Sequence, residues 1–217
     1  MRGRVAAAGR QLLAVGLLLV LTAGCTAPAG DDATRSGQLD AGGYVGGTSL
    51  PEPYVLPDET LTDTAGNAYN LVNSPSKPVT LMFFGYTHCP DVCVGVLSDV
   101  ATALQRMPAA SRDHIQVLFV TTDPERDTGA VIQRYLGQFD RTFIGLTGSA
   151  STISAVADQV GVEIEGRNPL PDGGYEIGHS AQVIGFDRRH RGVVLWTPPT
   201  PIGDLAADLT LLVARQQ

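Results

Sequence analysis

Apolar runs and helix-like periodicities alternate along the chain and predict a mixed α/β domain. Two continuous apolar segments, residues 79–84 and 115–120, have the length and composition of strands buried on both faces. Between them, apolar residues recur at helical spacing from Val92 to Met107, and Pro108 ends the pattern. This order predicts two parallel strands joined by a helical crossover.

The second half of the chain continues the alternation and ends in a hairpin and a helix. Further expected elements are helices over about residues 128–139, 149–160 and 201–213, a strand over 143–146, and a hairpin formed by 181–186 and 193–196 around a polar turn. Short strands near residues 54–56 and 60–61, with a turn at 64–67, indicate an N-terminal hairpin extension. This element order is that of a thioredoxin-like fold, with a central mixed sheet flanked by helices.

The N-terminal region reads as a targeting segment. Residues 1–24 have the layout of a signal peptide, because three arginines precede an apolar run and small residues then lead to Cys25. The small residues before Cys25 resemble a bacterial lipobox, in which the cysteine is lipidated and becomes the mature N-terminus. Leu21 lies one position earlier than usual for that motif, and an ordinary cleaved signal peptide is the alternative. We expect a lipid anchor on the extracytoplasmic face of the cell membrane.

Composition separates the anchor from the folded part. Residues 25–50 are rich in small and polar residues, which predicts a lipidated flexible tether, so the folded domain is expected over 51–217. The formal net charge is −7 and Lys77 is the single lysine, so the chain lacks the basic surface of a nucleic-acid-binding protein. No pattern indicates an obligate oligomer, and we expect a monomer.

Candidate chemistry lies where the first buried strand meets its helix. Functional groups in α/β sheets lie beyond the carboxyl ends of the strands, and Cys89 and Cys93 occupy that position. With Pro90 as the first helical residue, Cys89 lies at the helix N-terminus, where the dipole lowers the thiol pKa. Residues four apart in an ideal helix have Cα atoms about 6.2 Å apart, near the upper limit for a disulfide. The pair can form a reducible or a structural disulfide, bind a metal, or serve as small buried apolar residues.

Four histidines offer a third ligand. His114 and His190 are expected on the surface, and His88, beside Cys89, is expected to be a loop residue. His179 precedes an apolar strand and could return to the sheet end that carries the cysteines, or it could be an ordinary loop residue. Two thiolates and one imidazole suit Cu(I) and, with rearrangement, Cu(II), whereas a structural zinc site requires four ligands.

Three motifs resemble those of the Sco (SenC-like) family. Residues 83–93 resemble the signature of these membrane-anchored, thioredoxin-like copper-binding proteins, which help to assemble the CuA centre of cytochrome c oxidase. Residues 122–128 are very close to the family's Asp-Pro-Glu-Arg-Asp-Thr segment, and His179 follows Cys93 at about the family spacing. The resemblance implies that Cys89, Cys93 and His179 bind copper.

Three further positions bear on this site. Gly178 stands where family members often have Asp, which could alter the surroundings of the metal, and Val94 stands where many have Pro. Asp123, at the end of a buried strand, could orient a ligand, bind a backbone group or simply begin the next turn. Residues 125–127 are expected to fix the loop and cap the following helix.

Two functions from different classes remain. The first is a copper chaperone whose partner is the CuA-bearing subunit of cytochrome c oxidase or another copper protein. The alternative is a thiol–disulfide oxidoreductase, in which Cys89 attacks a disulfide such as the CuA cysteine pair and Cys93 resolves the intermediate. His179 favours the chaperone, because a dithiol reductase does not need it, and reductants of this fold usually have two residues between the cysteines. A protein that only binds a partner would leave this residue set unexplained, and a peroxidase would pair one reactive cysteine with a distant one.

Overall fold

The computed structural model describes residues 39–171 and 173–216, which form ten strands and five helices. The strands are β1 (Thr48–Val55), β2 (Thr60–Asp63), β3 (Ala68–Asn70), β4 (Val79–Gly85), β5 (Ile115–Thr121), β6 (Ile144–Thr147), β7 (Ile164–Pro169), β8 (Tyr175–His179), β9 (Val183–Phe186) and β10 (Arg191–Trp196). The helices are α1 (Val92–Arg106), α2 (Ala109–Arg112), α3 (Gly129–Leu136), α4 (Ala150–Gln159) and α5 (Ile202–Ala214). The predicted signal peptide, Cys25 and residues 26–38 of the predicted tether lie outside the described residues.

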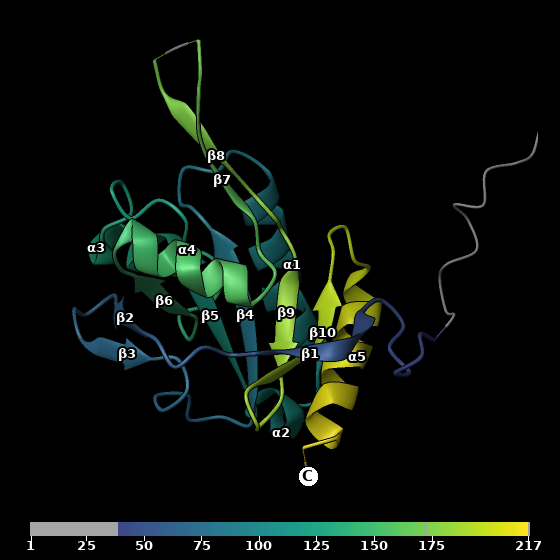
Figure 1. Ribbon diagram of the computed structural model, residues 1–217. Helices are drawn as coiled ribbons and strands as arrows, with labels where there is room; N and C mark the ends of the chain where they lie inside the picture. The colour runs from purple at the N-terminus through teal and green to yellow at the C-terminus, as the bar shows by residue number, and fades with distance from the viewer. Residues whose placement is uncertain (1–38, 172, 217) are drawn as a thin grey trace, which may run out of the picture. The chain divides into compact units, whose positions relative to one another are not determined.

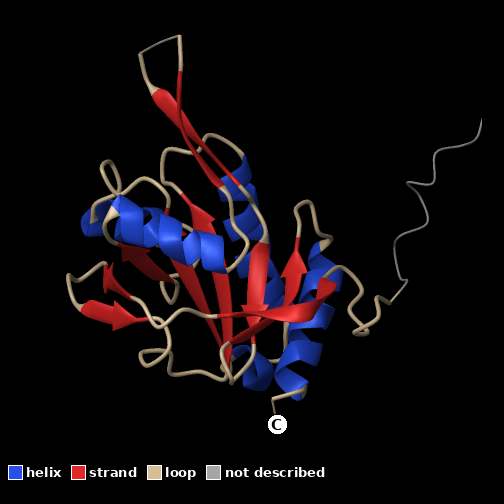
Figure 2. Ribbon diagram, viewed as in Figure 1, coloured by secondary structure: helices blue, strands red, loops and turns tan. Residues whose placement is uncertain are grey.

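Eight strands form one sheet in the order β1-β10-β9-β4-β5-β6-β2-β3 (Figure 1). Strand β4 pairs in parallel with β5, and β5 with β6, whereas β9 runs antiparallel to β4. Helices cover both faces of the sheet (Figure 2). The predicted mixed α/β architecture, with parallel crossovers followed by the β9–β10 hairpin and a closing helix, is confirmed.

The two faces of β4 belong to two separate hydrophobic cores. Leu81 and Phe83 pack with residues of α1, α3 and α5, whereas Met82 and Phe84 pack with residues of α4. Successive side chains of a strand point to opposite faces, and all seven residues of β4 are buried. The apolar run at residues 79–84 therefore reflects burial on both faces, as predicted from its composition.

The folded domain begins earlier than residue 51. Tyr44 is 1% exposed and belongs to the larger core. The buried carboxylate of Asp208 accepts the backbone N–H groups of residues 45–47 at 2.6, 2.9 and 2.8 Å, and the indole N–H of Trp196 at 3.0 Å. The expected extent of the tether to residue 50 is therefore wrong for residues 44–50, because Asp208 holds residues 45–47 on α5 and β1 pairs with β10, through backbone groups that composition does not reveal.

A second hairpin was not predicted from the sequence. Strands β7 and β8 form a separate two-stranded sheet, which projects beyond the central strands (Figure 1). Most of β7 is exposed, so its residues lack the apolar alternation that marks a half-buried strand. Strand β8 ends at His179, shortly before β9 begins. Within the described residues, no helix is both long and apolar enough to cross a membrane.

Candidate metal centre

Cys89 and Cys93 lie between the end of β4 and the first turn of α1. The helix begins at Val92 with Asp91 as its N-cap residue, so Pro90 is not the first helical residue and Cys89 precedes the helix. The Cys89 sulfur nevertheless accepts the backbone N–H of Cys93, with the two atoms 3.4 Å apart. This contact places the sulfur at the helix N-terminus, as the sequence suggested, although through a loop instead of the helix itself.

The two thiols differ in exposure and in proton affinity. Both are free, Cys89 partly exposed and Cys93 fully buried. The hydrogen bond from the Cys93 side chain, followed by those from His179 and from backbone N–H groups, lowers the pKa of Cys89 to about 3. The same shared proton, together with burial, raises the pKa of Cys93. The pair therefore consists of an outer thiolate and an inner thiol.

Sheet topology brings His179 to the cysteines. Because β9 runs antiparallel to β4 and pairs Val183 with Phe83, the chain entering β9 arrives at the carboxyl end of β4. The Nε2 atom of His179 lies 3.6 Å from the Cys93 sulfur, although the two residues are 86 positions apart. The structure thus brings together the three residues that the sequence singled out.

The His179 ring is oriented by its neighbours. Its Nδ1 atom is 3.0 Å from the carbonyl oxygen of Ser180, and because that oxygen can only accept, Nδ1 carries the hydrogen. The rings of Tyr86 and Phe83 meet the imidazole edge-on, with centroids 5.9 and 6.3 Å away. Nε2 therefore faces the sulfurs, which is the orientation that a metal ligand requires.

The three donors are close together but do not form a closed ligand set. Among residues 39–171 and 173–216, no group of three or more His, Cys, Asp and Glu side chains has the arrangement of a ready metal site. Cys89 and His179 also line a cavity of about 430 Å³. It opens between strand β8 and the loop from β4 to α1, which carries Cys89 and is called the cysteine loop. For all three donors to bind one shared ion, the side chains of Cys89, Cys93 and His179 therefore have to move closer together.

Gly85 provides the space for the buried sulfur. A Cβ atom at this position would lie 3.0 Å from the Cys93 sulfur, 3.0 Å from the Phe83 ring and 3.1 Å from the Phe119 ring. These distances are shorter than ordinary van der Waals contacts, so any larger residue would push Cys93 or the rings away. The glycine that ends the apolar run therefore belongs to the site.

Asp127 fixes the cysteine loop from the interior of the domain. Its fully buried carboxylate accepts the backbone N–H of Thr87 at 3.0 Å, the hydroxyl of Thr87 at 2.5 Å and the hydroxyl of Thr121 at 2.6 Å. The exposed His88 ring lies 3.8 Å from the same carboxylate, and His88 is a loop residue, as predicted. The cap of α3 is instead the hydroxyl of Thr128. From the sequence, residues 125–127 were expected to fix their own loop and to cap the following helix. Asp127 instead holds the cysteine loop, which carries Cys89.

Asp123 acts on the hairpin and makes its side-chain hydrogen bonds away from the three donors. Its buried carboxylate accepts hydrogen bonds from the Arg126 guanidinium and, at 3.0 and 3.2 Å, from the Tyr175 hydroxyl. Arg126 also stacks on the Tyr175 ring, 3.6 Å from its centroid, and donates to the Tyr175 carbonyl at 3.2 Å. Since Tyr175 begins the strand that ends at His179, Asp123 positions this histidine through β8.

Gly178, one of the two departures from the family pattern, has a steric explanation. A Cβ atom there would lie 2.5 Å from the Glu165 carboxylate, which extends from the facing strand β7. Glu165 thus fills the space that a side chain at position 178 would need. Val94, the other departure, is 43% exposed on α1 and is not part of either core.

The chain is similar to known proteins over most of its length. The model of the family described as SCO1/SenC matches residues 51–214. The mitochondrial protein SCO2 of Saccharomyces cerevisiae is 31% identical over 144 residues, which are 66% of this chain and 46% of that protein. The mitochondrial SCO2 homolog of Bos taurus is 36% identical over 104 residues, 48% of this chain and 39% of the relative. The matches thus span less than half the length of these mitochondrial relatives.

Solved structures share the fold. ScoI of Bradyrhizobium japonicum with copper bound is 34% identical, with a TM-score of 0.63 over 76% of this chain and 99% of that chain. ScoI of Arabidopsis thaliana with copper bound is 27% identical, with a TM-score of 0.67 over 76% of this chain and 98% of that chain. These similarities confirm the predicted thioredoxin-like fold.

Proposed function

Because the chain belongs to the SCO1/SenC family, we propose that it is a membrane-anchored extracytoplasmic copper chaperone that helps to assemble the CuA centre of cytochrome c oxidase. The cargo ion binds to the sulfurs of Cys89 and Cys93 and to Nε2 of His179. The observation that carries this proposal is the 3.6 Å approach of His179 to the Cys93 sulfur beside the low-pKa thiol of Cys89.

The donor set fits copper. Thiolate sulfur and imidazole nitrogen are soft and intermediate ligands, which favour copper over hard ions such as Mg²⁺ or Ca²⁺. One sulfur already ionises readily, because hydrogen bonds lower the pKa of Cys89. Binding of the cation removes the proton from Cys93, as a metal-bound thiol is deprotonated. Two relatives of this fold hold copper in their solved structures.

Exposure of the outer sulfur suits transfer to a partner. Cys89 faces the cavity, and Val92 and Val94, 46% and 43% exposed, place apolar surface on the adjacent turn of α1. A partner that docks there can replace Cys89 as a ligand with its own thiolate while Cys93 and His179 still hold the ion. The cargo then passes by stepwise ligand exchange and is never released to water.

An anaerobic copper titration tests this function. The reduced chain 26–217 should bind one Cu(I), and Cys89→Ser or Cys93→Ser should weaken binding severely. His179→Ala should weaken a Cu(II) complex most, because imidazole suits the oxidised ion better than thiolates do. His114→Ala is the matched control, since His114 is exposed and bonds only within its own turn at Ala110. A reduced chain that binds no copper would refute the proposal.

A second candidate function uses the same sulfurs. The outer, readily ionised Cys89 and the buried Cys93 have the arrangement of an attacking and a resolving cysteine in a thiol–disulfide oxidoreductase. The Cys89 thiolate would attack a partner disulfide and release one partner thiolate. Cys93 would then attack the mixed disulfide, leaving a Cys89–Cys93 disulfide and a reduced partner. If His179→Ala kept full dithiol activity and left every copper complex unchanged, this second function would replace the first.

The anchor is proposed from the first 25 residues alone. A lipid on Cys25 would hold the domain at the outer face of the cell membrane through burial of acyl chains. Incorporation of a radiolabelled fatty acid into the full chain in a bacterial host, lost in Cys25→Ser, tests this part. Labelling that persists in Cys25→Ser would refute it.

A further inference from the structure

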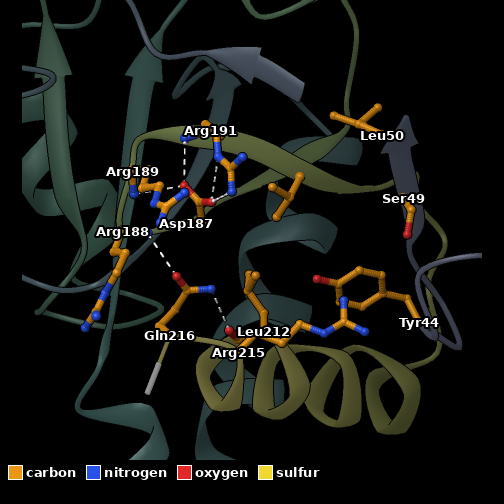
Figure 3. A pocket seen from close by; sticks show the side chains of 11 residues that line it. Tyr44, Ser49, Leu50, Asp187, Arg188, Arg189, Arg191, Leu212, Arg215 and Gln216 are labelled. Carbon is orange, nitrogen blue, oxygen red and sulfur yellow. Dashed lines mark hydrogen bonds and ion pairs between the residues drawn. The ribbon is translucent and has the colours of Figure 1, made fainter. Parts of the chain in front are cut away.

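A second cavity, of about 610 Å³ (Figure 3), lies at the opposite end of the sheet from the cysteines. Its walls are the turn between β9 and β10, the last turn of α5 and the first described part of the chain, from Tyr44 to Leu50. Since β9 is antiparallel to β4 and pairs Phe186 with Thr80, the turn after Phe186 lies at the amino end of β4. The cysteines lie at the carboxyl end of that strand, so the two sites face opposite directions.

Arginines dominate this cavity. Arg188, Arg189, Arg191 and Arg215 line it, although the chain as a whole has a net charge of −7. Asp187 is the only acidic residue among the lining side chains that the structure describes, and it is already occupied. It accepts Nε and Nη2 of Arg191 at 3.0 and 2.7 Å, and the backbone N–H groups of Arg189 and Arg191. The cavity therefore carries a net positive charge in an acidic protein.

Two of the arginines have free head groups. Arg188 and Arg189 are exposed in the turn and form no ion pair with any other described residue. The backbone N–H of Arg188 donates to the Gln216 side chain at 3.1 Å, which fixes the turn against the end of α5 (Figure 3). The position of the backbone is thus set while the guanidinium groups stay available to a ligand.

A buried hydroxyl points into the same cavity. Tyr44 is 1% exposed, and its hydroxyl has no acceptor among the described residues, since the neighbouring Arg215 can only donate. Figure 3 shows this hydroxyl directed toward the interior of the cavity, with Arg215 beside the ring, 4.8 Å from its centroid. The carboxylates nearest to Tyr44, those of Asp40 and Asp208, are bound to backbone N–H groups. A buried donor without an acceptor is costly, so a ligand oxygen here would satisfy it.

We propose that this cavity binds the phosphate group of an anionic phospholipid headgroup. Guanidinium groups match phosphate oxygens through paired N–H donors, and the Tyr44 hydroxyl adds a further donor. The lipid source is favoured by where the chain enters the domain, because Tyr44 and Ser49 both line the cavity. Thirteen residues lie between Cys25 and Leu39, so these two residues are at most about 50 Å apart and the cavity is within reach of a membrane that holds Cys25.

Headgroup binding would orient the domain. With the arginine cavity on the membrane, the cysteines and His179 at the other end of the sheet face away from the lipid surface. This orientation rests on the proposed lipid anchor, whereas the phosphate site itself does not. Copper plays no part in it, so the two proposals fail independently.

Vesicle flotation of the unlipidated chain 26–217, which keeps every residue of both cores, tests the proposal without copper. Vesicles containing phosphatidylglycerol should bind the chain, and vesicles of phosphatidylcholine alone should not. The double variant Arg188→Gln/Arg189→Gln should bind about thirtyfold more weakly, from the usual contribution of an arginine near an anionic surface. The matched control is Arg106→Gln/Arg134→Gln, which removes the same charge from exposed positions elsewhere and should change binding by less than about twofold.

A variant without a charge change separates a built site from general attraction. Tyr44→Phe should weaken vesicle binding severalfold while its melting temperature stays close to that of the parent, because the lost hydroxyl has no acceptor in the free protein. Equal losses in the two double variants, or no binding to phosphatidylglycerol, would overturn the proposal. The chain could instead fail to bind vesicles while inorganic phosphate shifts its arginine side-chain NMR signals. That result would overturn the proposal that the phosphate belongs to a lipid.

Discussion

The two sides of the cysteine–histidine site are held in different ways. Cys93 is fully buried in the larger core, and Asp127 fixes the preceding loop, which carries Cys89, from inside the domain. His179 instead ends the hairpin β7–β8, which projects from the sheet and is attached through Asp123, Arg126 and Tyr175 (Figure 1). The difference shows that the core sets the position of the inner sulfur, whereas a few contacts of the hairpin with Asp123 and Arg126 help to set the position of the imidazole.

The largest expected effect comes from breaking the inner side. Asp127→Ala removes the acceptor of three hydrogen bonds and leaves their buried donors unpaired, so the free energy of unfolding should fall by about 3 kcal/mol. Urea denaturation measures this change. The control Asp158→Ala, at an exposed position, should change the same quantity by less than about 0.5 kcal/mol. Similar losses in both variants would show that Asp127 does not hold the loop.

A smaller but more local effect is expected at Gly85. Gly85→Ala places a methyl group 3.0 Å from the Cys93 sulfur, and overpacking of this kind lowers the free energy of unfolding by about 1–3 kcal/mol. Copper stoichiometry should also fall, because the inner sulfur is displaced. Gly95→Ala, on the open face of α1, should instead stabilise the chain by about 0.5–1 kcal/mol. Unchanged copper binding in Gly85→Ala would contradict the close packing of Cys93.

The outer side should respond in binding more than in stability. Tyr175→Phe removes the hydroxyl that joins β8 to Asp123, so the free energy of unfolding should change by only about 1 kcal/mol. The affinity for Cu(II) should fall about fivefold, which a loss of about 1 kcal/mol in the positioning of His179 would cause. Tyr69→Phe, which removes an unpartnered buried hydroxyl from the other core, should leave Cu(II) affinity unchanged. Equal Cu(II) affinity in both variants would show that the contact of Tyr175 with Asp123 does not position His179.

The smallest expected effect is an absence of pH dependence. Because the pKa of Cys89 is lowered to about 3, its thiolate is present above that pH and is lost only when the pH falls toward it. Alkylation of Cys89 by iodoacetamide should therefore keep nearly the same rate from about pH 5 to pH 8, whereas an ordinary cysteine slows about tenfold per unit over this range. Mass spectrometry of the two cysteine peptides measures both rates. A tenfold decrease per unit for Cys89 would refute the lowered pKa.

Much of the fold could be predicted because buried strands and helix faces require apolar residues at regular positions in the sequence. Strands β4 and β5 are buried on both faces, and the periodicity of α1 follows from the one face that it buries. The hairpin β7–β8 could not be predicted, because its stability comes from backbone pairing and from contacts of Tyr175 with distant residues. The packing of residues 44–50 was missed for the same reason, since Asp208 holds it through backbone N–H groups.

The candidate site divides along the same line. Cys89, Cys93 and His179 were identified from residue chemistry, strand position and the resemblance to a family. Asp123 was singled out as a residue that could orient a ligand, and residues 125–127 as residues that fix the loop, but the partners of the two carboxylates could not be predicted, because Asp127 and Asp123 look alike in the sequence and differ only in what they bind. Asp127 holds the cysteine loop, and Asp123 holds the hairpin. The signal that could have suggested Asp127 is its place after the second buried strand, at the sheet end shared with Thr87.

The docking of hairpin β7–β8 has a consequence for how tightly an ion is kept. Regions held by few buried contacts open locally at a much lower free energy than the whole domain unfolds. If the hairpin lifts, one donor leaves while both sulfurs stay in place, so the dissociation rate of the ion follows this local opening. A thermally robust chain can then still release its cargo quickly, and substitutions in the hairpin would adjust residence time with only a small change in the melting temperature.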